Sequence, residues 1–327
     1  MSNPSVILTA QDAQALPARE RVGLAVARLD TATLVQTVIA AEAAGVRQVW
    51  STQSALQADT LTTFVAAVMR TSTVRLGTAI VPTYPRHPLT MASQALALND
   101  LAPGRLRLGV GPSHRPLIEG TYGMQMGKPL EHLREYLQVI RAALWTGQVD
   151  YQGKYFQVKA TLPRLAQIPI LISVLREHAF QLAGEIADGA ISWLCPVPYL
   201  LKTGLPALRA SAQAQDRSAP PLVAHVLVAM SEDQSAVLQA TRAQIQSYGR
   251  LPFYASMFAD AGYPVGPDGS MSDELIASLV ISGSSGAIAD RLQELLASGL
   301  DELLVWSVPI QQAQSEMHQL MQLIGSL

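Results

Sequence analysis

Polar side chains follow two apolar segments of the chain, residues 74–81 and 105–110, at the points where those segments end. In chain order these side chains are Tyr84, Arg86, His87, Ser113, His114 and Arg115. Arginine binds anions, and histidine can move a proton near neutral pH. In a (β/α)8 barrel the strands fill their own interior, so only the loops after their C-terminal ends can build a site. The pattern therefore predicts a barrel with its chemistry at the strand ends.

His114 is the strongest candidate for acid–base chemistry. It follows Gly111, Pro112 and Ser113, and glycines there let the backbone approach a flat ligand closely. The imidazole can act as a general acid or base, or donate a hydrogen bond to a cofactor ring. The alternative is a histidine that only holds a long loop in place. The segment does not complete a dinucleotide fingerprint, because His114 stands at the third glycine position and no helix begins there.

Two arginines mark candidate anion sites. Arg86 precedes a helix predicted to begin at Pro88, and it either balances an anionic ligand or pairs with a nearby carboxylate. Arg176 is followed by Glu177 and His178 at the start of another predicted helix, where backbone N–H groups bind phosphate. A solvated helix start is the alternative at that second position.

Composition excludes several classes of protein. The 327 residues are 49% hydrophobic and 15% charged, with a net charge of −2 and no basic block, so nucleic acid is not an expected partner. We find no apolar run long enough for a membrane helix and no secretory signal, which predicts a cytoplasmic protein. The single cysteine, Cys195, is interpreted as a small buried hydrophobe, and the histidine spacing predicts no metal site.

Alternation of apolar runs with helical periodicity predicts eight strand–helix units in one domain, preceded by an N-terminal extension over residues 1–20. The expected strands are residues 22–27, 46–51, 74–81, 105–110, 168–174, 190–194, 222–229 and 303–307. Residues 148–158 predict a β-hairpin outside the barrel. Insertions follow strands four and seven, and the second has helices near 235–247 and 284–298 with a loop or lid between them.

Five segments carry a resemblance to a known family. They are AEAAGVRQVW, RLGTAIVPTYPRHPLTMASQA, GRLRLGVGPSHRPLIEGTYG, EYLQVIRAALWTGQVDYQGKYFQV and LAGEIADGAISWLCP. In this order they lie between residues 41 and 196, within a resemblance that covers roughly residues 21–310. The chain resembles the bacterial-luciferase-like oxidoreductases, specifically the branch that uses the deazaflavin coenzyme F420, with FMN as the alternative cofactor.

This resemblance implies a (β/α)8 TIM barrel with the cofactor ring in its mouth, and a non-proline cis peptide at Ala79-Ile80. The positions implied to bind the cofactor are Ser51, Thr52, Gln53, Ala79, Ile80, Pro82, Gly111 and Ser113, with Arg86 as a further candidate. His114 takes the catalytic position, and the cofactor phosphate is expected at Leu175, Arg176, Glu177 and His178. Many relatives have an acidic residue or histidine where Ser51-Thr52-Gln53 stands, and Gly-Pro where Arg176-Glu177 stands.

The implied function is hydride transfer between F420 and a small organic substrate, with His114 handling the accompanying proton. A reductase is favoured over an alcohol dehydrogenase. The alternatives are an FMN-dependent monooxygenase and a non-catalytic flavin or deazaflavin binder. A hydrolase or aldolase would need paired carboxylates or a reactive lysine at the strand ends, and none is found there. The apolar outer helices are compatible with a homodimer.

Overall fold

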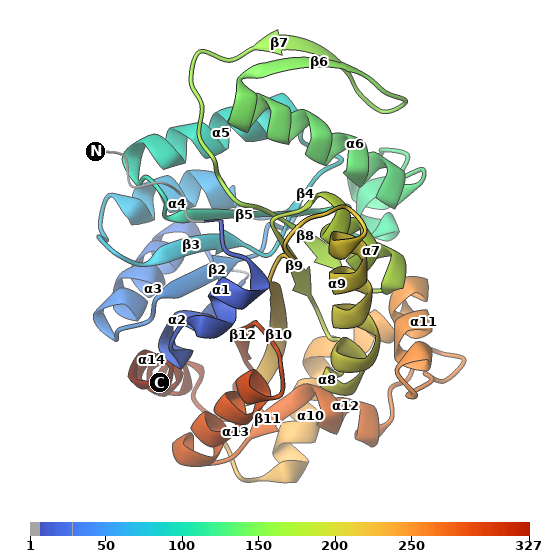
Figure 1. Cartoon of the computed structure of the whole chain (residues 1–327). Helices are drawn as coiled ribbons and strands as arrows, with labels where there is room; N and C mark the ends of the chain where they lie inside the picture. Colours follow the sequence, from blue (N-terminus) through green and yellow to red (C-terminus); the bar gives the residue numbers. More distant parts are fainter. Residues whose placement is uncertain (1–6, 28) are drawn as a thin grey trace.

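A closed barrel of eight parallel strands forms the centre of the molecule (Figure 1). The computed structural model describes residues 7–27 and 29–327. The barrel strands are β1 (Val22–Val26), β2 (Gln48–Ser51), β3 (Arg75–Thr78), β5 (Leu106–Gly111), β8 (Ile170–Val174), β9 (Gly189–Ser192), β10 (Leu222–Ala229) and β12 (Glu302–Ser307). Pairing of β12 with β1 and of β9 with β10 completes the ring. The predicted (β/α)8 fold is confirmed.

The third predicted strand is divided in two. After β3 comes the cis peptide Ala79-Ile80, and then a short strand, β4 (Val81–Pro82), which pairs with β5. The sequence pattern also missed a strand, β11 (Val280–Ser282), which pairs with the end of β10. This end of β10 extends beyond its pairing with β9, so it has a free edge to which β11 adds.

Eight long helices follow the barrel strands. They are α3 (Thr31–Ala43), α4 (Thr60–Val68), α5 (Pro88–Leu101), α6 (Pro129–Arg141), α7 (Glu177–Ile186), α9 (Leu205–Gln213), α13 (Ser285–Ala297) and α14 (Ala313–Ser326). Their starts follow local rules: the Asp30 carboxylate accepts the Thr33 N–H at the start of α3, and Pro88 opens α5, where a missing N–H costs nothing. Gly45 follows α3 with a φ of +91°, which a glycine adopts without strain.

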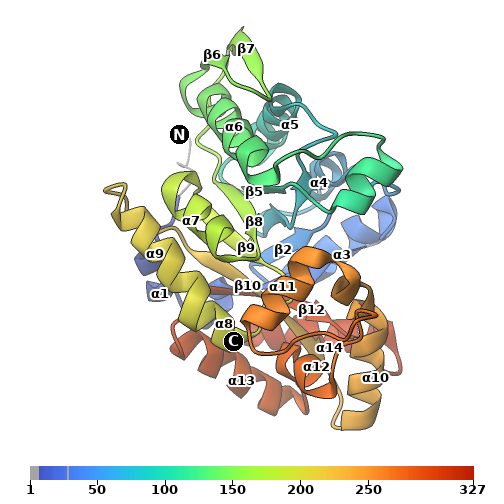
Figure 2. The ribbon, with the colours of Figure 1, turned by 90° about the vertical axis from the view of Figure 1, so that its right-hand side faces the viewer.

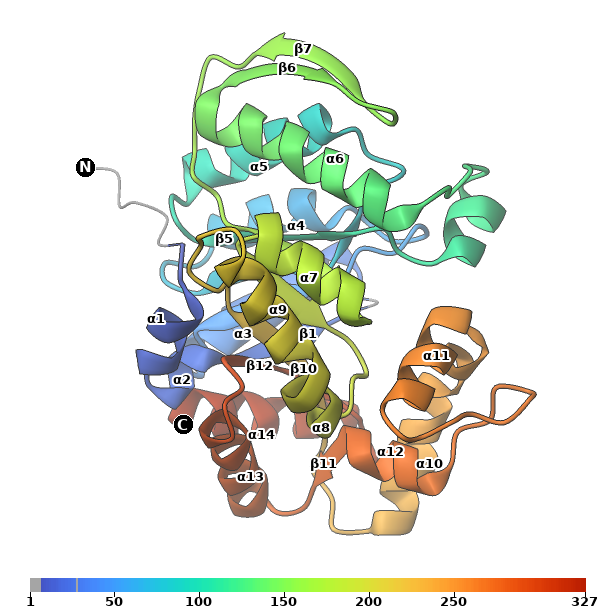
Figure 3. The ribbon, with the colours of Figure 1, turned by 45° about the vertical axis from the view of Figure 1, so that its right-hand side comes forward.

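The remaining elements complete the chain. They include the α-helices α1 (Ala10–Ala15), α2 (Ala18–Arg21), α8 (Val197–Tyr199), α10 (Gln234–Ile245), α11 (Pro252–Asp260) and α12 (Asp273–Leu279). They also include the π-helical turns η1 (Pro116–Thr121), η2 (Ala142–Thr146) and η3 (Leu200–Gly204), and the 3₁₀ helix η4 (Gln246–Arg250). The insertion after β10 holds α10, η4, α11 and α12, which stand together at one side of the barrel (Figure 2, Figure 3). No described helix is both long and apolar enough to cross a bilayer.

The predicted hairpin is confirmed, and it lies away from the barrel. Strands β6 (Gln148–Gln152) and β7 (Gln157–Thr161) pair antiparallel and lie beyond α5 and α6 (Figure 1). The Glu135 carboxylate on α6 accepts N–H groups from the turn of the hairpin, at Lys154, Tyr155 and Phe156. These bonds anchor the hairpin to the helix, so it plays no part in building the open end of the barrel.

Apolar side chains and one ion pair fill the barrel interior. The apolar layer consists of Ala25, Trp50, Leu171, Ile191, Val223 and Leu304. Nearer the start of the strands, Arg107 donates two hydrogen bonds of 2.6 and 2.8 Å to Glu302. Burial alone would raise the pKa of Glu302, but the positive charge of Arg107 and its hydrogen bonds lower that pKa overall. The barrel is therefore plugged, and a ligand can enter only above the apolar layer.

Candidate functional site

A cavity of about 1210 Å³ opens at the C-terminal ends of the strands. Every barrel strand contributes to its wall at or near its end, through Val26, Thr52, Ala79, Pro112, Val174, Trp193, His225 and Trp306. Ligand pockets usually measure about 300–1,000 Å³, so this one has room for a cofactor ring and a small substrate together. The candidate site therefore lies where the sequence predicted chemistry.

Most of the predicted site residues border this cavity. They are Thr52, Gln53, Ala79, Ile80, Ser113, His114, Leu175, Arg176, Glu177 and His178. The other predicted residues, Ser51, Pro82, Arg86 and Gly111, do not border it. The structure thus brings together residues that lie more than 120 positions apart in the sequence.

Contacts with other residues account for the positions of Arg86 and Gly111 outside the cavity lining. Arg86 Nη2 lies 2.5 Å from Asp59 Oδ2, so the guanidinium is paired with a carboxylate, which is the alternative that the sequence left open. A Cβ atom on Gly111 would lie 2.1 Å from the Ser173 hydroxyl on β8. The glycine therefore makes room for the neighbouring strand, whereas the sequence suggested that it makes room for a ligand.

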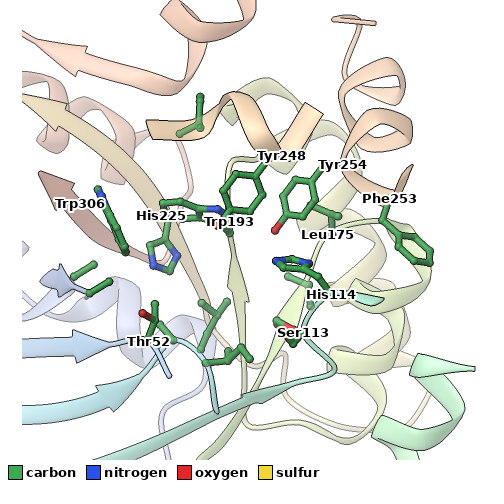
Figure 4. A pocket seen from close by; sticks show the side chains of 18 of the residues that line it. Thr52, Ser113, His114, Leu175, Trp193, His225, Tyr248, Phe253, Tyr254 and Trp306 are labelled. Carbon is green, nitrogen blue, oxygen red and sulfur yellow. The ribbon is translucent and has the colours of Figure 1, made fainter. Parts of the chain in front are cut away.

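His114 stands in the wall of the cavity, held by a turn and by two tyrosines. Ser113 has a φ of +62°, an uncommon conformation for a residue with a side chain, and it turns the chain sharply after β5. The imidazole centroid lies 5.9 Å from the Tyr248 ring and 5.7 Å from the Tyr254 ring (Figure 4). Burial lowers the pKa of His114, so its imidazole is neutral at neutral pH and ready to accept a proton.

The charged residues of the cavity wall, within the described part of the chain, are Arg176, Glu177 and Asp260, and all three are exposed at the rim. Arg176 precedes the first turn of α7, as expected of a phosphate ligand. Its Nε, however, lies 3.0 Å from Asp260 Oδ2 on α11. An anion that binds here must share Arg176 with this carboxylate or displace it.

Aromatic rings from four parts of the chain line the inner wall. Trp193 follows β9, His225 lies within β10, and Trp306 lies within β12, while Tyr248 and Tyr254 come from the insertion after β10 (Figure 4). The Trp193 ring lies 5.0 Å from both the His225 and Trp306 rings. The sequence analysis did not select His225, Trp306, Tyr248 or Tyr254. His225 had a usable signal, because it is the one polar residue of the apolar segment LVAHVLVA.

These residues suit a flat ring with an anionic tail. The inner wall offers flat aromatic faces and the apolar side chain of Ile80. The Nε1 of Trp193 is buried and has no hydrogen-bond partner among the described residues. The one arginine of the described wall lies at the rim, where a tail would leave the barrel. The donor set and the shape therefore fit a flavin or a deazaflavin.

Other chemistries have less support in the described residues. No group of three or more His, Cys, Asp or Glu side chains is placed to hold a metal ion within residues 7–27 and 29–327. Cys195 is buried, and burial raises the pKa of its thiol. A neutral buried thiol is a poor nucleophile, which agrees with its interpretation as a small hydrophobe.

Fold and site together define a (β/α)8 barrel protein with a cavity at its open end. The model of the luciferase-like monooxygenase family matches residues 7–302, and the chain belongs to this family of enzymes. It is 25% identical over 282 residues to the 5,10-methylenetetrahydromethanopterin reductase of Methanopyrus kandleri, covering 74% of this chain and 79% of the reductase.

Solved structures share the fold. An F420-dependent secondary alcohol dehydrogenase, in complex with an F420-acetone adduct, superposes with a TM-score of 0.77 at 16% identity, covering 93% of this chain and 98% of the dehydrogenase. The oxygenating constituent of 3,6-diketocamphane monooxygenase from Pseudomonas putida, in complex with FMN, gives 0.72 at 16% identity, covering 94% and 97%. At such identities the likeness establishes the fold alone.

Proposed function

We propose that this protein is an F420-dependent oxidoreductase that transfers a hydride between the deazaflavin and a small organic substrate. The observation that carries the proposal is the polarity of the cavity, which is aromatic and apolar inside and has an arginine at its rim. A bound deazaflavin supplies a ring carbon that gives or accepts the hydride. The relatives that use F420 support this cofactor, and the FMN-containing relatives supply the alternative.

The protein would contribute orientation, exclusion of water and one proton site. The Trp193 and Trp306 rings offer flat faces that hold a ring in place, and the surrounding apolar wall keeps water out. His114 holds or moves the proton that accompanies the hydride. Because its imidazole is neutral at neutral pH, it is poised to accept the proton of a hydroxyl group as that group is oxidised. In the direction of reduction the same imidazole must first be protonated.

Cofactor titration tests the proposal directly. Trp193 and Trp306 line the cavity, so a bound ring should quench tryptophan fluorescence when F420 is added. Quenching by F420 followed by hydride exchange supports the proposal. Quenching by reduced FMN alone, with oxygen consumption, would establish the monooxygenase alternative. Binding of F420 with no hydride exchange across a broad substrate panel would identify a binding protein.

Substitution of His114 tests the proton site. His114→Ala should lower turnover by about 10²- to 10⁴-fold, as expected for a lost acid–base group, while cofactor affinity changes little. His318→Ala is the matched control, because His318 is exposed on α14 and does not border the cavity. Equal turnover in the two variants would remove histidine from the mechanism.

A further inference from the structure

His225 lies at the floor of the cavity, directly above the barrel plug. Side chains alternate along a strand, so His225 points to the same side of β10 as Val223, which belongs to the apolar layer inside the barrel. Ala79 and Ile80, which link β3 to β4, pack against that same layer. His225 is only 7% exposed, and it borders the cavity and a smaller pocket beside it.

The hydrogen bonding of His225 fixes which of its ring nitrogens carries hydrogen. Nδ1 lies 2.6 Å from the backbone carbonyl oxygen of Ser192, which can only accept, so Nδ1 must donate. Burial lowers the pKa of His225 from 6.5 to about 4, and the ring is neutral at neutral pH. Nε2 therefore carries a lone pair and acts as an acceptor.

This acceptor has no hydrogen-bond donor among the described residues. The Ser192 carbonyl is the one hydrogen-bond partner of the His225 side chain within residues 7–27 and 29–327, and the Trp193 ring meets it edge to face at 5.0 Å. His225 borders the cavity, so an N–H or O–H of a ligand in the cavity can donate to this nitrogen.

We propose that Nε2 of His225 accepts a hydrogen bond from the imide N–H of the flavin or deazaflavin ring. Both ring systems carry one imide N–H, and the Nε2 acceptor of His225 at the floor of the cavity is complementary to this donor. The contact would set how deeply the ring enters the barrel. This inference rests on the proposed function, because it needs one of the two rings in the cavity.

Two substitutions separate ligand binding from a structural role. In His225→Asn the shorter amide can still donate to the Ser192 carbonyl, in place of Nδ1, but it cannot reach the position of Nε2. In His225→Gln the longer amide can place its oxygen near the position of Nε2, but it loses the bond to Ser192. A role in ligand binding predicts that Gln substitutes better than Asn, and a purely structural role predicts the reverse order.

The measurement is the dissociation constant of F420 and of FMN, by calorimetry, with thermal unfolding as a check on folding. For the ring that binds the wild type, His225→Asn should weaken binding about 2- to 12-fold, the usual worth of one hydrogen bond, and His225→Gln should weaken it less. An analogue of that ring methylated at the imide nitrogen should bind the wild type and His225→Asn equally.

The outcomes that overturn the inference are distinct from those that overturn the proposed function. Unchanged affinity in His225→Asn, or stronger binding by His225→Asn than by His225→Gln, refutes the hydrogen bond while leaving the cofactor in place. A wild-type protein that binds neither F420 nor FMN refutes the proposed function and this inference with it.

Discussion

The ion pair between Arg176 and Asp260 allows a sharp test of the predicted phosphate site. Arg176 stands at the start of α7, and Asp260 ends α11 in the insertion after β10. Their side chains are 48% and 43% exposed. If the cofactor phosphate binds Arg176, the carboxylate competes with it, so Asp260→Asn should tighten binding of the phosphate-bearing cofactor.

The size of the effect follows from the geometry of the pair. Two unit charges 3.0 Å apart attract each other by about 1.4 kcal/mol in water. Screening by salt reduces this attraction, and so does the entropy lost when the two side chains are held in one geometry. Exposed ion pairs are usually worth about 0.2–1 kcal/mol. Release of Arg176 should therefore tighten phosphate binding by about 1.4- to 5-fold.

The assay compares F420 with the same deazaflavin lacking its phosphate, by fluorescence titration. Asp260→Asn should tighten binding of F420 alone, Arg176→Ala should weaken it, and both effects should shrink at high salt. Asp150→Asn is the control, because Asp150 forms an exposed pair with Lys159 on the outer hairpin. If Asp260→Asn and Arg176→Ala both bind F420 as the wild type does, the phosphate site is elsewhere.

Three further predictions concern stability and are checked by urea unfolding. Glu302→Gln should destabilise the protein by about 3–5 kcal/mol, because its buried arginine partner loses the opposing charge; a change below about 1 kcal/mol would contradict a dry ion pair. His132 and His225 both have a pKa lowered by burial from 6.5 to about 4, so each binds its proton more readily when unfolded. The free energy of unfolding that the two neutral histidines contribute is fully present above pH 6.5 and is lost as the pH falls towards 4, by on the order of 3 kcal/mol for each. Equal unfolding free energies at pH 7 and pH 4.5 would refute this. Gly109→Ala should cost about 1–3 kcal/mol, because its Cβ would lie 1.9 Å from a backbone oxygen of β3, whereas Gly120→Ala meets no atom within 4 Å and should change stability by less than about 0.5 kcal/mol.

The sequence alone determined the eight barrel strands, most of the helices and the end of the barrel at which the cavity opens. A strand buried on both faces is a continuous apolar run, and a helix repeats every 3.6 residues, so both patterns can be recognised locally. The hairpin was found for the same reason, since one face of each strand is exposed and the other is buried. His114 could be placed because it follows a strand directly.

Only the tertiary structure decided which side chains meet. It paired Arg86 with Asp59 and Arg176 with Asp260, and it brought Tyr248 and Tyr254 of the insertion against His114. These partners are far apart in sequence, and the path of a long insertion depends on packing against the rest of the barrel, which no local period encodes. Strand direction is a local property, so the end of the barrel at which the cavity opens could be predicted from the sequence. The contacts that would hold the ligand depend on distant segments, and these acquire their positions only when the barrel closes.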